Sequence, residues 1–348
     1  MNENVLLIYN DVEDPAGNEN TLWQQSCAGV LAEVKAVSEA MDKLGVTYRL
    51  ESIKKFEQLP AILNRCPEKI IFNLAEEFPD NIADACFVPI VCKAFGRACC
   101  GNGTEALLAS QDKGKAKAIL TAAGVMCPDG IVVKPGEKIA ASKLKAGRYF
   151  VKPLFSDASE GIDADSVVKV PGASLQKKIK KIHDQLGQPA VVEQFIAERE
   201  LNVSVLEHNG KAEVIAIAEI DFSAFEKDQP RIVDYSAKWH PDSFGFNNTP
   251  RVLPAPISKR AAKLVEKYAL AAWETIGCVD YARVDFRMDG EENPFVLEVN
   301  PNPDISPDAG FAAAVEFAGL AYEDFIRIVL ENAAGRLSIT QNKKARKL

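Results

Sequence analysis

Two apolar segments near the C-terminus constrain the fold of this chain more than any other feature. They read ARVDFRMD (282–289) and PFVLEVN (294–300), and the short linker Gly-Glu-Glu-Asn joins them. Alternation of apolar and polar residues is typical of β-strands, and a short linker containing glycine predicts a hairpin. The prolines that follow, in PNPDISP, remove backbone donors and predict that strand pairing ends there.

The register of this hairpin decides which polar side chains meet. Centring the turn in the linker places Asp285 opposite Glu298 and Arg283 opposite Asn300, and directly opposed residues of an antiparallel pair project to one face. Burial of the other face would fix this register. The residues predicted for that apolar face are Val284, Phe286, Leu297 and Val299.

The polar face of the predicted hairpin carries two carboxylates and an amide beside an arginine. Like charges that face each other on paired strands are destabilising unless something compensates them. Magnesium is a suitable compensator, because it prefers oxygen ligands and keeps positions open for phosphates. We therefore expect Asp285, Glu298 and Asn300 to bind a metal ion; the alternative is a hairpin with one solvated polar face.

The first hundred residues alternate between strand and helix patterns. Such alternation predicts a parallel sheet covered by helices. The segment contains no G-x-G-x-x-G or G-K-[ST] phosphate loop, so the common dinucleotide-binding and P-loop folds lose support. The predicted strands lie near 5–9, 47–53, 69–74 and 97–100, and the predicted helices near 27–44, 56–65 and 82–94.

The rest of the chain is richer in strands. Asn209-Gly210 predicts a two-residue hairpin turn. Ser258 is a predicted N-cap, and Gly277 a predicted helix end. The predicted strands are GIVVK, GRYFVKP, AVVEQFI, ELNVSVLEH and KAEVIAIAEI, and the predicted helices lie over 104–123, over 258–275, from Ser306, and over 322–333.

Composition disfavours several classes of protein. The net charge is −8, so no surface for nucleic acid or anionic membrane is expected, and the basic stretch 343–347 is predicted to be a frayed end. No apolar run is long enough to span a membrane. The eight cysteines form no C-x-x-C pair and the three histidines show no ligand spacing. Reduced thiols and a cytoplasmic location are expected, and zinc is not.

A lysine and a polar loop could bind phosphates. Lys152 stands at the end of the strand YFVKP, just before the loop from Ser156 to Gly161. Hydroxyls, turn amides and a glycine suit a loop that covers phosphates, and the lysine would neutralise their charge. An ordinary surface loop is the alternative.

Further residues are candidates for the same nucleotide. Lys113 and Lys117 share one face of a predicted helix, where a solvated basic face is the alternative. Glu193 and Glu200 flank the connector QFIAER, whose backbone could contact adenine while Glu200 reaches the ribose; solvated glutamates are the alternative. Lys238, in DYSAKW, is a candidate contact for the terminal phosphate.

In their order and spacing these segments resemble the ATP-grasp superfamily, and in particular its D-alanine–D-alanine ligase-like branch. They run from about Asp112 to Pro307. The segments are DKGKAKAILTAAGV, YFVKPLFSDASEGI, VVEQFIAERELNVSV, DYSAKW and RVDFRMDGEENPFVLEVNPNPDISP.

The resemblance implies an ATP-grasp fold with α/β and α+β parts, and it suggests a homodimer. The implied division is an N-terminal parallel α/β domain (1–103), a small central ATP-grasp lid (104–196), a C-terminal antiparallel-sheet domain (197–335) and a basic tail (336–348). It further implies an ATP-dependent reaction that joins a small carboxylate to a small amine through an acyl phosphate. Neutralising the transferring phosphoryl group would be the main catalytic work.

The resemblance also implies roles for single residues. Arg283 would stabilise the reacting centre, and Lys238 would contact the terminal phosphate. The implied metal-binding set, for magnesium or alternatively manganese, is Asp285, Glu298 and Asn300. The implied ATP-binding set is Lys113, Lys152, Ser156, Ser159, Gly161, Glu193, Phe195, Ile196, Glu200 and Lys238.

The amino-acid half of the site departs from these ligases. YNDVEDPAGNEN does not match the glycine- and glutamate-containing motif that helps hold the first amino acid, and Ala309-Gly310 replaces a serine that grips the second substrate's carboxylate. Trp239 stands where tyrosine is usual. Free amides at the helix start near 308–311 could bind a carboxylate, whereas Asp304 and Asp308 would favour an amine; a simple capping role for Asp308 is the third alternative.

Two other functions stay open at this level. A small-molecule kinase on the same scaffold would make a stable phosphorylated product without any amine. A non-catalytic nucleotide-binding protein would bind ATP without turnover.

Overall fold

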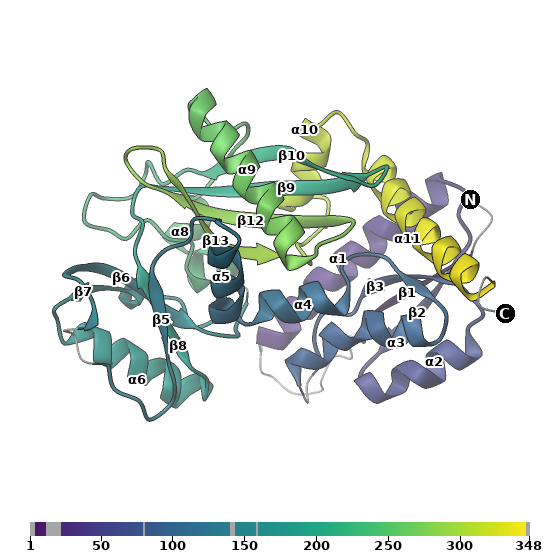
Figure 1. The fold of residues 1–348 in the computed structure, drawn as a ribbon, viewed down its shortest axis with the longest axis horizontal. Helices are drawn as coiled ribbons and strands as arrows, with labels where there is room; N and C mark the ends of the chain where they lie inside the picture. Colours follow the sequence, from purple (N-terminus) through teal and green to yellow (C-terminus); the bar gives the residue numbers. More distant parts are fainter. Residues whose placement is uncertain (1–3, 12–21, 79–80, 140–142, 158, 346–348) are drawn as a thin grey trace.

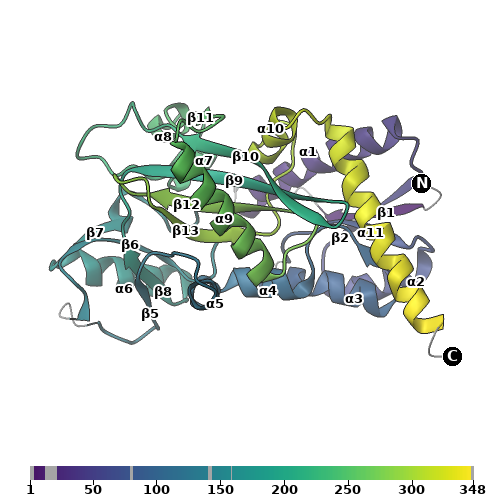
Figure 2. The same ribbon diagram turned by 45° about the horizontal axis from the view of Figure 1, so that its top comes forward.

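The computed structural model describes residues 4–11, 22–78, 81–139, 143–157 and 159–345. Its strands form three sheets that follow one another along the long axis of the molecule (Figure 1). A small antiparallel sheet lies at one end, a parallel sheet at the other, and a five-stranded antiparallel sheet between them, as a second view also shows (Figure 2). The predicted parallel N-terminal sheet and antiparallel C-terminal sheet are confirmed, and the small sheet, for which no strand direction was predicted, is antiparallel as well. Within the described ranges, no helix is both long and apolar enough to cross a bilayer.

The N-terminal sheet is parallel, as predicted, with the strand order β2-β1-β3-β4. Its elements are β1 (Val5–Asn10), α1 (Leu22–Lys43), β2 (Tyr48–Ile53), α2 (Leu59–Arg65), β3 (Ile70–Leu74), α3 (Val88–Ala94) and β4 (Ala98–Cys99), with 3₁₀ turns at Phe56–Gln58 and Ile82–Phe87. Val5 and Leu7 pack into a core with α1 and the C-terminal helix, whereas Leu6 and Ile8 pack with α2 and α3. Burial on both faces explains the unbroken apolar run of this strand.

The helix predicted after the parallel sheet is two helices, α4 (Thr104–Gln111) and α5 (Lys113–Ala122). Asp112 separates them, because its side chain caps α5 by accepting a hydrogen bond from the Lys115 amide at 2.9 Å. Aspartate is a preferred N-cap residue, so it favours a helix start at this position. The break places Lys113 in the first turn of α5.

The small sheet at the other end is antiparallel, with the strand order β5-β8-β6-β7, and α6 packs on it. The sequence pattern did not predict β7, a four-residue strand at the edge of this sheet. The elements are β5 (Gly130–Val133), β6 (Gly147–Pro153), β7 (Val167–Val170), α6 (Ser174–Leu186) and β8 (Ala190–Gln194).

The five-stranded sheet has the order β11-β10-β9-β12-β13, and α9 covers one face of it. Its elements are β9 (Arg199–His208), β10 (Lys211–Ile220), α7 (Tyr235–Trp239), α8 (Phe244–Asn247), β11 (Arg251–Val252), α9 (Lys259–Ile276), β12 (Tyr281–Met288) and β13 (Pro294–Asn300). Asn209 and Gly210, with φ of 55° and 73°, form the predicted hairpin turn. Ser258 and Gly277 bound α9, also as predicted.

One predicted helix start near the C-terminus is wrong. The helix expected from Ser306 begins only at Gly310, as α10 (Gly310–Phe317). Ser306 instead forms a turn with Asp304, whose carboxylate accepts from the Ser306 amide at 2.8 Å and from its hydroxyl at 2.6 Å. The N-cap of α10 is Ala309, with no side-chain hydrogen bond, so Asp308 is not its cap.

The hairpin of β12 and β13 holds the predicted pairing at its polar end, but not along its whole length. After Asp285 a β-bulge shifts the register by one residue, so that Phe286 pairs with Val296. Val296 is therefore fully buried, whereas Leu297, predicted for the apolar face, is half-buried and lines the cavity described below. The confirmed pairs are Arg283–Asn300, Val284–Val299 and Asp285–Glu298.

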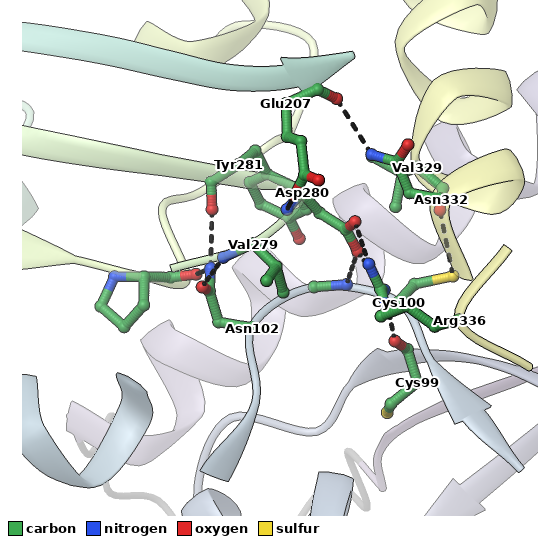
Figure 3. A network of polar contacts seen from close by, with 12 residues as sticks. Cys99, Cys100, Asn102, Glu207, Val279, Asp280, Tyr281, Val329, Asn332 and Arg336 are labelled. Atoms are coloured by element: carbon green, nitrogen blue, oxygen red, sulfur yellow. Dashed lines mark hydrogen bonds and ion pairs between the residues drawn. The ribbon is translucent and has the colours of Figure 1, made fainter. Parts of the chain in front are cut away.

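Helix α11 (Tyr322–Ala345) continues through most of the segment predicted as a frayed tail, and its Arg336 joins separate parts of the fold (Figure 3). The guanidinium donates to both carboxylate oxygens of Asp280, at 2.6 and 2.7 Å, and to the Cys99 carbonyl at 2.9 Å. Asp280 is fully buried and also accepts from the Gly101 amide at 2.7 Å. This ion pair ties α11, the end of the parallel sheet and the start of β12 together.

Asn102 holds both strands of the polar hairpin at the end where the polar residues lie (Figure 3). Its amide group donates to the Tyr281 carbonyl at 2.7 Å and to the Pro301 carbonyl at 2.6 Å, and its oxygen accepts from the Val279 amide at 2.7 Å. Tyr281 begins β12 and Pro301 follows β13. The N-terminal part of the fold therefore fixes the position of the hairpin.

Replacing Arg336 by methionine tests how much the Asp280–Arg336 ion pair contributes to stability. The change leaves the buried Asp280 carboxylate without its cation, so we expect Arg336→Met to lower the free energy of unfolding by about 3–5 kcal/mol. The control is Arg327→Met on the same helix, where the exposed pairs with Asp324 and Glu331 should contribute about 1 kcal/mol or less. Urea denaturation measures both; equal losses would contradict the assigned role of Arg336.

Candidate active site

A single cavity of about 750 Å³ collects residues from all three sheets. Two residues named as candidates from the sequence, Gly161 and Lys117, are not among the residues that line it. The predicted residues that do are Lys113, Lys152, Ser156, Ser159, Glu193, Phe195, Ile196, Glu200, Lys238, Arg283, Asp285, Glu298 and Asn300.

The carboxylates of the hairpin are buried among cations. Arg283 donates two hydrogen bonds to Asp285, at 2.7 and 2.8 Å, and Asn202 donates a third at 2.8 Å. Burial would raise the pKa of Glu298, but the charges of Lys113, Lys152 and Arg283 outweigh it and lower that pKa to about 2. Glu298 is thus held in the charged form. Asn202 lies on β9 and pairs with Asp285 only in the folded sheet, so nothing in the local sequence indicated this contact.

Two lysines that line the cavity, Lys113 on α5 and Lys152 on β6, form ion pairs with carboxylates outside the hairpin. Lys113 donates to the Ser156 carbonyl at 2.6 Å and pairs with Asp157 at 3.1 Å. Lys152 pairs at 3.1 Å with Glu193, which also contacts Lys117. Lys113, Lys117 and Glu193 are largely inaccessible to solvent, whereas Asp157 is exposed. The alternative of a solvated basic helix face is therefore wrong for Lys113 and Lys117, and so is that of a solvated Glu193.

Burial and neighbouring charges shift the pKa values of these lysines. Burial lowers the pKa of Lys152 to about 8 and that of Lys117 well below its usual value, and the neighbouring lysine charges act in the same direction. For Lys113 the carboxylates of Asp157 and Glu298 outweigh burial and raise the pKa. A bound polyanion would relieve the repulsion among these cations, which suits a phosphate chain.

The loop between β6 and β7 is anchored on both sides. The Ser159 hydroxyl donates to the Val233 carbonyl at 3.0 Å, and the Ser156 hydroxyl accepts from Gln188 at 2.7 Å. Gly161 has φ of +72°, and a Cβ on it would lie 2.7 Å from Pro153 Cγ. Glycine at 161 is thus required by the backbone and by packing, without contact to the cavity.

The connector between β8 and β9 is held by Arg287, which the sequence analysis missed. Its guanidinium donates to the Ile196 carbonyl at 2.8 Å, the Ala197 carbonyl at 3.0 Å and the Glu200 carboxylate at 2.9 Å. Its centre also lies 5.3 Å from the centre of the Phe195 ring. Arg287 therefore fixes the connector whose backbone was expected to contact adenine. Its place on β12, two residues after Asp285, was the available signal.

Lys238 and Arg251 are the remaining cations among the described residues that line the cavity. Lys238 lies 5.5 Å from the centre of the Trp239 ring, and burial together with the nearby Arg283 lowers its pKa. Arg251, on β11, donates at 3.4 Å to the carbonyls of Asp308 and Ala309, just before α10. No motif pointed to Arg251, because only the pairing of β11 with β10 brings it to the cavity.

Oxygen ligands for a metal ion are present, although the protein supplies few of them. In the part of the chain that the structure describes, no three His, Cys, Asp or Glu side chains are grouped to hold a metal. Asp285 and Glu298 face each other beside Asn300, whose side-chain oxygen accepts from the Asn302 amide at 3.0 Å. Such a set leaves most coordination positions to water or phosphate oxygens, as magnesium sites usually do.

The comparisons with known proteins agree with this geometry. Residues 138–331 match the family model described as D-ala D-ala ligase C-terminus. The D-alanine–D-alanine ligase of Caulobacter vibrioides is 27% identical over 305 residues, covering 87% of this chain and 88% of that protein. That of Gluconobacter oxydans is 29% identical over 236 residues, covering 68% and 72%. An uncharacterized protein of Sinorhizobium fredii is 29% identical over 267 residues, covering 77% and 75%.

The fold matches as well. The D-alanine–D-alanine ligase of Bacillus anthracis, solved in complex with ATP, superposes with a TM-score of 0.73 at 17% identity and covers 97% of this chain and 99% of that one. The ligase of Coxiella burnetii superposes with a TM-score of 0.71 at 14% identity. The expected ATP-grasp fold is confirmed, and the chain belongs to the D-alanine–D-alanine ligase-like family of ATP-dependent ligases that form carbon–nitrogen bonds.

Proposed function

We propose that this protein is an ATP- and magnesium-dependent carboxylate–amine ligase that works through an acyl phosphate on substrates other than two D-alanines. The observation that carries the proposal is the single cavity in which Asp285 and Glu298 meet the buried Lys113 and Lys152. These groups come from β13, β12, α5 and β6, so the fold assembles them from distant parts of the sequence.

The residues present fit magnesium. Asp285 Oδ1 accepts from both Arg283 and Asn202, but Oδ2 accepts only from Arg283 among the described residues, so it retains a lone pair. Glu298 is charged, and the Asn300 oxygen accepts a single backbone hydrogen bond. Asp285, Glu298 and Asn300 would therefore hold the ion, which when bound supplies positive charge beside the phosphates.

The other residues take roles that their contacts support. Lys113 and Lys152 would bind the phosphate chain, and the loop from Ser156 would cover it. The connector fixed by Arg287 would receive adenine, and Glu200 the ribose. Burial raises the pKa of Glu200 despite the opposing charge of Arg287.

At the reacting end, positive charge would stabilise two successive species. Lys238 and Arg283 would neutralise the phosphoryl group as the substrate carboxylate attacks the terminal phosphorus and ADP leaves. The amine would then attack the acyl carbon, and Arg283, whose pKa Asp285 raises against the effect of burial, would stabilise the oxyanion until inorganic phosphate departs.

The amino-acid half supports different substrates. Ala309 and Gly310 offer no hydroxyl at the start of α10, and Trp239 replaces the usual tyrosine. The stretch YNDVEDPAGNEN lies mostly outside the described residues. Arg251 and the uncapped α10 favour a carboxylate of one substrate near 308–311, because free helix amides and a cation attract anions.

Phosphate release against pairs of amino acids and amines tests the reaction type. We expect ADP and phosphate to form only when both a carboxylate and an amine are supplied, with the amide product identified by mass spectrometry. A stable phosphorylated product formed without an amine would show a kinase instead. ATP binding without turnover in every mixture would show a nucleotide-binding protein.

Removing one carboxylate charge from the proposed metal-binding residues tests the role assigned to the hairpin. Asp285→Asn and Glu298→Gln should each lower kcat by about 100-fold or more, which corresponds to about 2.7 kcal/mol in the barrier, while the far-UV circular dichroism stays unchanged. Glu291→Gln, an exposed carboxylate in the turn of the same hairpin, should keep full activity. Full magnesium-dependent activity in both site variants would contradict the assignment.

The phosphate loop can be tested through its glycine. Gly161→Ala places a methyl group against Pro153 and Leu186 and keeps φ positive, whereas Gly187→Ala, with φ of +63°, meets nothing within 4 Å. Both changes should cost about 1–2 kcal/mol of stability for the left-handed backbone, and Gly161→Ala a further ~1–3 kcal/mol for overpacking. Thermal unfolding measures the difference. The KM for ATP should rise only in Gly161→Ala; unchanged KM in both variants would remove the loop from the ATP site.

A further inference from the structure

Three carboxylates from different elements line the same cavity outside the phosphate and metal set. Glu33 lies on α1, Glu76 follows β3 and Asp304 follows β13. Glu33 Oε1 accepts from the Ile305 amide at 2.8 Å, and Glu76 Oε1 accepts from the Asn302 side chain at 2.6 Å. The mechanism above uses none of the three.

Glu33 is the least satisfied of these groups. Its exposed fraction is 3%, and its second oxygen, Oε2, accepts from no donor among the described residues; the side chain within hydrogen-bonding range of Glu33 is another acid, Asp304. A buried carboxylate without a partner is costly, and native proteins normally pair it with a cation or a donor. An oxygen of this kind in the wall of a substrate cavity is a position for a donor from the substrate.

The described residues around Glu33, Glu76 and Asp304 supply little positive charge. The titratable groups that interact electrostatically with Glu33 are Glu76, Asp304, Tyr281 and Tyr322. Burial and the Glu76 charge raise the pKa of Glu33 to about 10, and burial and Asp304 raise that of Glu76 to about 8 despite the nearby Lys238.

We propose that Glu33, Glu76 and Asp304 bind the ammonium group of a basic substrate, so that one of the two compounds joined is a diamine or a diamino acid. The inference rests on the proposed ligase function and names its substrate class. A neutral-side-chain amino acid brings one ammonium group together with a carboxylate, which would add negative charge to an acidic site. A compound with two amino groups can place one ammonium here and present the other as the nucleophile.

Binding in this arrangement has a defined proton balance. Glu33 is protonated in the free protein at neutral pH, because its folded-state pKa is raised above that pH. An ammonium group favours the ionised carboxylate. The carboxyl proton must then leave to the solvent, and no covalent bond changes at this step. A purely structural role of Glu33 would release no proton.

Calorimetric titration with 1,3-diaminopropane, and with propylamine as the matched monoamine, tests the site. We expect the wild-type chain to bind the diamine at least tenfold more tightly than the monoamine at pH 7.5. The apparent enthalpies in buffers of different ionisation enthalpy should show proton release. Equal binding of the two amines, or no proton release, would overturn the inference.

Variants locate the site. Glu33→Gln should lower the affinity for the diamine at least tenfold and reduce proton release, whereas Glu39→Gln, an exposed carboxylate on the same helix, should change neither. Glu76→Gln serves as a second variant, with the same expected loss, should Glu33→Gln not fold. Unchanged diamine binding in a folded Glu33 or Glu76 variant would contradict the proposal.

Turnover separates this inference from the proposed function. ATP-dependent phosphate release should be at least tenfold faster with 2,3-diaminopropionate or ornithine, in either configuration, than with alanine, and Glu33→Gln should remove that preference while still binding ATP. Equal rates with alanine would overturn the diamine inference and leave the ligase function standing. Failure of every acid–amine pair to release phosphate, with ATP bound, would overturn the ligase function itself.

Discussion

The structure depends on one unfavourable contact: two carboxylates that face each other across paired strands inside the protein. Asp285 and Glu298 cannot both be charged there without cations close by. Arg283 supplies one cation from the same strand, and Lys113 and Lys152 supply two more from α5 and β6. The lysines are buried beside one another, so they too are under strain until an anion arrives. Under the proposed function, a nucleotide with its metal ion would place an anion beside the lysines and a cation beside the carboxylates.

The rest of the fold keeps these groups in position. Asn102 holds both strands of the hairpin at the polar end, and the Asp280–Arg336 pair ties that end to α11 and the parallel sheet. The break at Asp112 starts a new helix so that Lys113 reaches the loop after β6. Arg287 fixes the connector on the other side. A site built from rigid elements in this way needs little rearrangement of its own side chains to bind.

Local patterns in the sequence predicted the elements, the parallel sheet and the polar pairing of the hairpin, because alternation and turn residues act over short distances. What they missed depends on contacts between distant segments. Arg287 and Asn202 look like ordinary strand residues until β12 and β9 pair, and Glu33 looks like one more charged residue of an amphipathic helix. The start of α10 was misjudged because Asp304 captures Ser306 in a turn. The helix continues past 333 where Ala334 and Leu337 pack into the core beside the parallel sheet, which no local signal in a basic segment reveals.

The bulge after Asp285 has a consequence for how such chains diverge. It takes up one extra residue on β13, so the spacing of Asp285 and Glu298 is independent of the register near the turn. Insertions or deletions in the linker at 289–293 can be absorbed there, and the pairing of Asp285 with Glu298 is shielded from them. A protein engineer could therefore extend this outer loop, or attach a tag to it, without moving the two paired carboxylates.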